Sequence, residues 1–166
     1  MKKTSFILAG ALCFLSVLTS AGDAGETLFH KQVREKMPAL ASFHQTGSRS
    51  WELLDKEGKK LGTLHLENID DSQRKEGYAG TIEVALVVNE KDEIAGVLIG
   101  KNQETPRFLK RVQASGFLEK WNGMTLRKAS ETDMDTVSRA TYSSSAIAYG
   151  VKNLAASLLG EESGNR

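Results

Sequence analysis

Hydroxyl side chains are concentrated between residues 135 and 145, directly before a segment whose apolar residues recur at helical spacing. Those apolar residues are Ile147, Val151, Leu154 and Leu158. Ser and Thr in such a position can cap the unpaired amides of a first helical turn. The same amides, with the positive end of the helix dipole, can hold a phosphate group. The stretch is therefore either an ordinary cap after a serine-rich loop, or a phosphate site in which a Thr hydroxyl binds the phosphate or is esterified to it.

A second helix start with chemically useful residues has the sequence Gln-Glu-Thr-Pro-Arg over residues 103–107. Thr105 is a residue type favoured as a helix cap, and Pro106 is favoured at the first helical position. Glu104 adds a carboxylate beside the amides of that helix start, so the two together could hold a polar ligand. The alternative is a helix start that binds nothing.

Four β-prone segments must position these two helix starts. They cover residues 50–54, 60–66, 81–88 and 93–100. Turn residues between the members of each pair predict two β-hairpins. Gly77 and Gly80 precede the third segment, where they either allow a close backbone approach or simply end a charged loop of residues 67–76.

The first 21 residues have the layout of a secretory signal peptide, with two lysines, an apolar run from Phe6 to Leu18 and small residues up to Ala21. The apolar run is short for a membrane span. An uncleaved N-terminal anchor, which would associate the protein with a membrane, is the alternative. Both interpretations predict an exported protein, periplasmic in a bacterium.

The rest of the chain divides into a lead-in, a main domain and a tail. We predict a signal peptide or anchor at residues 1–21, a helical lead-in at 22–48, one domain at 49–160 and a flexible tail at 161–166. The lead-in is expected to hold an amphipathic helix over residues 26–41, disturbed by Pro38. The helix that starts at Pro106 is expected to break near Gly116, before a second short helix in residues 117–123.

Cysteine content and charge exclude several classes of function. Cys13 is the one cysteine among the 166 residues, and it lies in the predicted signal peptide, so disulfides, iron–sulfur clusters and c-type haem attachment are excluded for the mature chain. Removing residues 1–21 takes away two of 22 basic residues and none of 21 acidic ones, which leaves a net charge of −1. This balance gives no general affinity for nucleic acid. The three histidines are isolated in the sequence, so no metal site is predicted.

The segment Asp135-Thr-Val-Ser-Arg-Ala-Thr141, followed by Ser143 and Ser144, resembles the flavin-attachment motif of the FMN-binding domain family. This domain occurs in the C subunit of the sodium-pumping NADH:quinone oxidoreductase and in the G subunit of Rnf complexes. The family motif runs Asp, two variable residues, Ser or Thr, Gly, Ala, and then Thr or Ser. The resemblance implies that its last hydroxyl, Thr141 in this chain, is joined to FMN through a phosphoester by a separate flavin transferase.

Four further segments resemble the family in the same order along the chain. They are Gly77-Tyr-Ala-Gly80 with the strand after it, Glu93-Ile-Ala-Gly-Val97, Asn102-Gln-Glu-Thr-Pro106 and Phe117-Leu-Glu-Lys-Trp-Asn-Gly123. The resemblance implies an α+β fold, with a mainly antiparallel sheet and packed helices. It also implies FMN as the cofactor, with its phosphate at Thr141 and its ring system near Glu104 and Thr105.

The resemblance assigns the candidate site residues. The implied cofactor-binding residues are Thr141, Ser138, Arg139, Ala140, Ser143, Ser144, Asp135, Glu104, Thr105, Gly77 and Tyr78. The hydroxyls of Ser138, Thr141, Ser143 and Ser144 are expected to satisfy phosphate oxygens. Asp135 would repel a phosphate, so its implied role is in the sequence presented to the transferase.

Two arginines depart from the family pattern, because Arg139 and Arg107 stand where the family usually has Gly. Arg139 has two opposite interpretations. Its bulk and charge could spoil recognition by the transferase, or its guanidinium could clasp the phosphate of FMN in a bidentate way.

The leading functional hypothesis is an exported electron-transfer flavoprotein that passes electrons between a membrane donor and a soluble or membrane acceptor. The sequence has no Rossmann-type glycine fingerprint and no evident acid–base pair, which favours a redox carrier over a self-contained enzyme. One alternative is a binding or assembly module of the same fold with no flavin or with non-covalent FMN. Another is a small flavin-dependent reductase with its own substrate.

Overall fold

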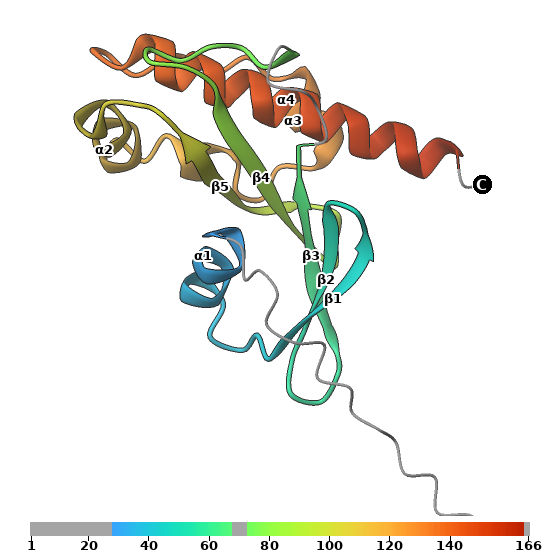
Figure 1. Cartoon of the computed structure of the whole chain (residues 1–166). Coiled ribbons are helices and arrows are strands. Elements are labelled where there is room, and N and C mark those ends of the chain that lie inside the picture. Colours follow the sequence, from blue (N-terminus) through green and yellow to red (C-terminus); the bar gives the residue numbers. More distant parts are fainter. Residues whose placement is uncertain (1–27, 68–72, 165–166) are drawn as a thin grey trace, which may run out of the picture.

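A computed structural model describes residues 28–67 and 73–164, which form one five-stranded antiparallel sheet with helices on both faces (Figure 1). The strands are β1 (Ser42–Gly47), β2 (Ser50–Leu54), β3 (Lys60–Leu66), β4 (Ile82–Asn89) and β5 (Ile94–Asn102), paired in chain order. The helices are α1 (Leu28–Lys36), α2 (Pro106–Ala114), the 3₁₀ helix η2 (Leu118–Trp121), α3 (Leu126–Glu131) and α4 (Thr141–Gly164). The predicted α+β class and both predicted β-hairpins are confirmed.

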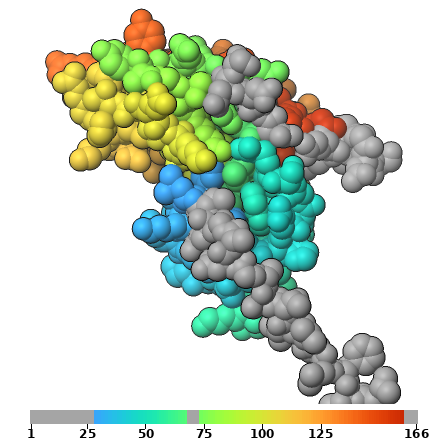
Figure 2. Space-filling model, in the orientation of Figure 1, coloured from blue at the N-terminus to red at the C-terminus, as the bar shows by residue number. Residues whose placement is uncertain are grey.

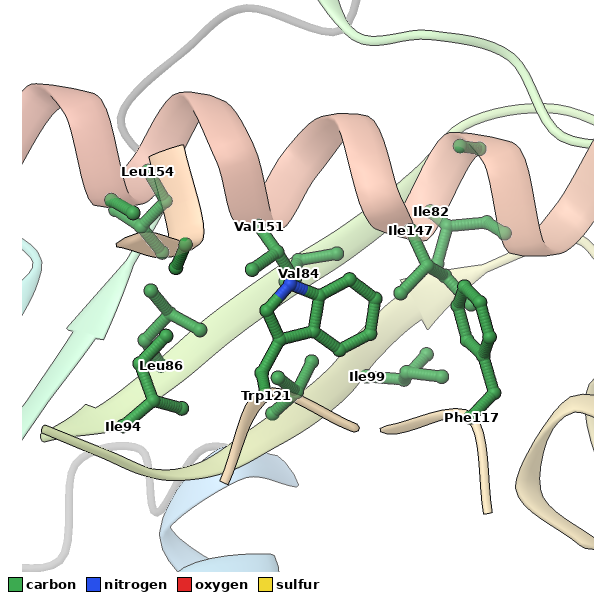
Figure 3. Close-up of a cluster of buried hydrophobic side chains, with 14 of the residues drawn as sticks. Ile82, Val84, Leu86, Ile94, Ile99, Phe117, Trp121, Ile147, Val151 and Leu154 are labelled. Atoms are coloured by element: carbon green, nitrogen blue, oxygen red, sulfur yellow. The ribbon is translucent and has the colours of Figure 1, made fainter. Parts of the chain in front are cut away.

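The larger hydrophobic core lies between one face of the sheet and the C-terminal helices. Alternate residues of β4, such as Val84 and Leu86, point to this face because successive strand residues face opposite sides. Ile147 and Val151 of α4 pack against them (Figure 3). Trp121 of η2 fills the layer below α4, with its ring edge-on to a neighbouring phenylalanine. The core thereby holds the long helix α4 across the sheet.

The smaller core lies on the opposite face, where α1 packs. Phe29 and Val33 of α1 are buried against the other set of β4 side chains, including Ala85 and Val87. A side chain at Gly100 of β5 would overlap the ring of Phe29, so glycine is needed for this approach. Strand β4 is thus covered on both faces, which explains its apolar run from Val84 to Val88.

The N-terminal lead-in differs from the helical segment predicted for residues 22–48. The helix covers Leu28–Lys36 and ends before Pro38, whereas Ser42–Gly47 forms β1 and pairs with β2. This strand is mostly exposed, so it has no alternation of apolar residues to indicate it. Pairing with β2 satisfies its backbone groups, and that pairing is a tertiary effect.

Two more differences concern the C-terminal half. Helix α3, which the sequence analysis did not predict, begins after a cap in which the Thr125 hydroxyl accepts from the Lys128 amide. Helix α4 runs through Gly164, so the predicted flexible tail of residues 161–166 is helical over its first four residues. The predicted signal peptide lies outside the described residues. Within residues 28–67 and 73–164, none of the helices combines the length and the apolar character that crossing a membrane requires.

Candidate functional site

Three segments that are far apart in the sequence meet at the N-terminal end of α4. They are the loop of residues 77–80, the loop between β5 and α2, and the turn of residues 137–144. Figure 1 shows the start of α4 next to the loop before β4, with α2 on the same side. In the space-filling view the corresponding green, yellow and orange surfaces form one end of the molecule (Figure 2). The fold therefore brings together two of the helix starts that the sequence analysis singled out.

The buried carboxylate of Glu104 ties the three segments together. One of its oxygens, Oε1, accepts hydrogen bonds from the backbone amides of Tyr78 at 2.6 Å and Ala79 at 3.0 Å. The other oxygen, Oε2, accepts from the Ser143 hydroxyl at 2.5 Å. Glu104 is 7% exposed and Ser143 is fully buried, so the bond between them is made away from bulk water, where it counts most, whereas the two amide bonds are partly exposed. The glutamate lies behind the site and positions its walls.

Gly77 is needed because the Glu104 carboxylate lies against its Cα. A Cβ atom at this position would overlap Oε1 of Glu104 and come within 3.1 Å of the Ile82 side chain. The Gly77 amide also donates to the carbonyl of Gly80 at 2.8 Å, which closes the loop into a tight turn. The close-approach interpretation of this glycine agrees with the geometry.

Two of the predicted phosphate ligands, Ser143 and Ser144, are fully buried and bonded within the protein. Ser144 Oγ accepts from the Val137 amide at 2.9 Å and donates to the Ala140 carbonyl at 2.9 Å. These bonds shape the turn that leads into α4. Ser143 and Ser144 therefore hold the turn in shape, whereas the other two predicted phosphate ligands, Thr141 and Ser138, are exposed.

Arg139 adopts a left-handed backbone conformation, with φ of 62°. This region is costly for a residue with a Cβ and is ordinarily occupied by glycine. The flavin-attachment motif that this segment resembles has Gly at this position, so the arginine keeps a turn that glycine would make easily. Ala140 follows it, buried, and Thr141 then begins α4 as an exposed residue.

A pocket of about 230 Å³ opens directly at the first turn of α4. It is lined by Tyr78, Phe108, Arg139, Ala140, Thr141, Tyr142 and Ser143. The rings of Tyr78 and Phe108 meet edge to face, with centroids 4.8 Å apart. The pocket thus combines an aromatic wall with an exposed threonine and the start of a helix.

The sequence analysis missed two residues of this pocket. Phe108 of α2 is half-buried: it packs against the edge of the larger core and also forms a wall of the pocket, while Val112 one turn later is fully buried. Tyr142 is 67% exposed and follows directly after Thr141. Its position next to the motif threonine is the sequence feature that could have identified it as a site residue.

The remaining predicted site residues lie around the pocket. Asp135 and Ser138 are exposed in the loop before α4 and are not among the pocket-lining residues. Thr105 stands at the cap position of α2 with Pro106 at the first helical position, as predicted, but its side chain makes no capping hydrogen bond. In the two described ranges, no three His, Cys, Asp or Glu side chains are grouped to hold a metal ion.

Residues 77–156 match the family model of the FMN-binding domain. This part of the chain belongs to the FMN-binding domain family. The matched segment begins at Gly77 and ends within α4, so it contains all three segments that form the pocket. A comparison with curated proteins gave no match. The family indicates FMN as the cofactor.

The residues at the pocket fit this cofactor. A flavin carries a flat aromatic ring system at one end, for which Tyr78 and Phe108 offer apolar ring surfaces. The phosphate at its other end suits a helix N-terminus with an exposed hydroxyl and an adjacent guanidinium. Thr141 and Arg139 of the FMN-binding domain provide both.

Proposed function

We propose that the protein is an exported electron-transfer flavoprotein in which FMN is attached through a phosphoester to Thr141. The observation that carries this proposal is the placement of Thr141. It is exposed, it begins α4, and it lines the same pocket as Tyr78 and Phe108. Of the hydroxyls in the turn, those of Ser143 and Ser144 are already engaged in buried hydrogen bonds.

Attachment requires that the Thr141 oxygen reach the phosphorus of an activated flavin nucleotide. Thr141 Oγ1 would form the new P–O bond, lose its proton and displace a leaving group that the activated flavin carries on phosphorus. The positive end of α4 and the Arg139 guanidinium would favour the incoming phosphate. The exposed loop with Asp135 would be the part of the chain that a flavin transferase recognises.

A carrier role is supported by what surrounds the pocket. When bound, FMN supplies the ability to accept and release one or two electrons. The chain's own residues would bind and orient it: Glu104 positions the Tyr78 loop and the first turn of α4 through its three hydrogen bonds. The exposed Tyr78 and Tyr142 leave the pocket open on one side, as exchange with a redox partner requires.

Export is proposed from the N-terminal sequence. The layout of residues 1–21 is that of a secretory signal or an N-terminal anchor. Covalent attachment suits a location outside the cytoplasm, where a dissociated cofactor would be lost by dilution. The membrane or soluble redox partner would meet the protein in that compartment.

The decisive experiment is to coexpress the full chain with a flavin transferase, export it, and measure its intact mass and its flavin fluorescence after denaturation. We expect one FMN per chain in the wild type and in Thr141→Ser, and none that survives denaturation in Thr141→Ala. Thr136→Ala removes another exposed hydroxyl from the same loop and should retain the flavin. Denaturation-resistant flavin in Thr141→Ala would refute the assignment of the attachment residue.

A wild-type protein whose mass equals that of the processed polypeptide, and which takes up no added FMN, would instead favour the flavin-free assembly module. Arg139→Gly separates the two interpretations of that arginine. If Arg139 hinders the transferase, the glycine variant gains flavin loading; if Arg139 holds the phosphate, the variant binds free FMN less tightly.

A further inference from the structure

We call the pocket at the first turn of α4 the flavin pocket. A second hollow lies beside it and is lined by Arg107, Phe108, Arg111 and Arg139. We call it the arginine hollow. Phe108 and Arg139 line both the hollow and the flavin pocket, so the two share a border. Helix α2 supplies three of the four residues, and the turn before α4 supplies Arg139. The hollow is therefore built where α2 meets the start of α4, next to Thr141.

The arginine hollow concentrates positive charge without a compensating carboxylate. No acidic residue is among its lining residues. Within residues 28–67 and 73–164, no carboxylate lies within ion-pair distance of Arg107, Arg111 or Arg139. The Arg107 guanidinium stacks over the Phe108 ring, 4.9 Å from its centroid. Three arginines therefore line one small space, and none of them has an ion-pair partner in the part of the chain that the structure describes.

This arrangement is unfavourable for the protein alone in three ways. Arg107 and Arg111 are four residues apart on α2, where like charges repel. Arg107 also lies in the first turn of α2, near the positive end of its dipole. Arg139 pays the cost of a left-handed backbone conformation. Local costs that converge on one place indicate a function there, and a bound anion would offset all the charge repulsion.

We propose that the arginine hollow binds the phosphate group of FMN non-covalently, so that FMN is held at this end independently of the ester to Thr141. The proposal rests on the proposed function, since it assigns residues to the phosphate of the same flavin. A guanidinium matches a phosphate with two parallel hydrogen bonds and keeps its charge at any physiological pH. Because Arg139 lines both spaces, it connects the threonine that would carry the phosphate with the two arginines of α2.

The test uses the full-length Thr141→Ala protein, made without a flavin transferase, so that no ester can form. FMN and riboflavin, which lacks the phosphate, are titrated separately, and binding is followed by quenching of flavin fluorescence. We expect FMN to bind at least about tenfold more tightly than riboflavin, since hydrogen bonds to charged groups have this magnitude. Raising the salt concentration should weaken FMN binding and leave riboflavin binding nearly unchanged.

The arginines are then tested by Arg107→Gln combined with Arg111→Gln in the Thr141→Ala background. Both residues are exposed, so the variant should fold normally. FMN affinity should fall by about tenfold, to near that of riboflavin. The matched control is Lys101→Gln combined with Lys110→Gln, which removes two exposed positive charges from the same end of the molecule outside the hollow. It should leave the preference for FMN intact.

Equal affinities for FMN and riboflavin in the Thr141→Ala protein would overturn the arginine proposal while supporting the flavin pocket. An equal loss of FMN affinity in the lysine control would also overturn it, because the effect would then be one of overall charge. If neither flavin binds, loading of the wild type by the transferase decides whether the arginine proposal alone or the proposed function as well is refuted. A loaded wild type refutes only the arginine proposal, whereas an unloaded one refutes the proposed function as well.

Discussion

Two buried glutamates, Glu67 and Glu104, brace the same helix in different ways. Glu67 accepts a hydrogen bond from one backbone amide and Glu104 from two, and each lies against a glycine whose Cβ would collide with its Oε1. The glycine is Gly150 of α4 for Glu67, and Gly77 for Glu104. Glu67 forms an ion pair with Arg74 at 3.1 Å, whereas the donors to Glu104 are two amides and the hydroxyl of Ser143.

The two glutamates therefore have different roles: Glu67 stabilises the fold, and Glu104 shapes the site. Glu67 joins β4 to the middle of α4, away from the flavin pocket. Glu104 instead holds Tyr78 and Ser143, which both line that pocket. The same carboxylate chemistry therefore serves stability at one position and the geometry of the site at the other. Changes at the two glutamates should separate folding from flavin capture.

The largest effect on stability is expected for Glu67→Ala. It removes the Glu67 carboxylate from the Arg74 guanidinium, whose side chain is 11% exposed, and from the Val84 amide. Breaking a buried ion pair by removing one partner costs about 3–5 kcal/mol. Urea unfolding followed by circular dichroism measures this loss. The fraction of folded molecules that capture flavin should stay at the wild-type level, and a large drop in that fraction would contradict the comparison.

For Glu104→Ala we expect a loss of stability of about 3 kcal/mol together with a loss of flavin capture. The change leaves two amides and the Ser143 hydroxyl without their acceptor. A buried group that loses its partner costs about 1–3 kcal/mol, and the two amides cost less because Tyr78 and Ala79 are exposed, which keeps the total near about 3 kcal/mol. Flavin capture is measured well below the unfolding temperature, so that only folded protein is counted. Glu104→Gln keeps an acceptor for the amides and serves as the control, with a smaller effect on both quantities. Full flavin capture by Glu104→Ala would show that this brace does not form the site.

Alanine substitutions at the two glycines test the same comparison. Gly77→Ala places a Cβ against the Glu104 carboxylate and the Ile82 side chain, and overpacking of this kind costs about 1–3 kcal/mol. Gly150→Ala meets Glu67 and Val84, but alanine inside a helix regains about 1 kcal/mol of propensity. Thermal unfolding should therefore show the lower midpoint for Gly77→Ala. The reverse order would mean that the α4–Glu67 contact is the tighter of the two.

The smallest effect is a dependence of stability on pH. Burial raises the pKa of the Glu67 carboxyl above its ordinary value of 4.5, although the Val84 amide and Arg74 act in the opposite direction. A carboxyl with a raised pKa in the folded protein contributes stability that is complete below pH 4.5 and is lost as pH rises through the folded pKa. Relative to Glu67→Gln, which does not titrate, the wild type should lose stability as pH rises through this range. Urea midpoints of both proteins measured across that interval test the sign, and a widening advantage of the wild type would contradict it.

Much of the local structure was predictable from the sequence. The hairpin of β4 and β5 is built from long runs of β-prone residues around a polar turn, and Thr105 with Pro106 marked the start of α2. Strand β1 could not be predicted, because its exposed residues form a strand only through pairing with β2. The exposed Thr141 and the buried Ser143 also looked alike in the sequence. Burial distinguishes them, and it depends on segments far away along the chain.

The sequence alone determined the two hairpins and the hydroxyl-rich start of α4, because each depends on residues that are neighbours in the chain. It also determined the family of residues 77–156, because the family motifs are short and follow one another in a fixed order. Only the tertiary structure decided that Glu104 joins the Tyr78 loop to Ser143, and that Phe108 forms a wall of the pocket. It also brought Arg139 to the two arginines of α2. The residues that Glu104 joins are 25 to 39 positions away from it in the sequence. Such residues come into contact because α4 packs on the sheet.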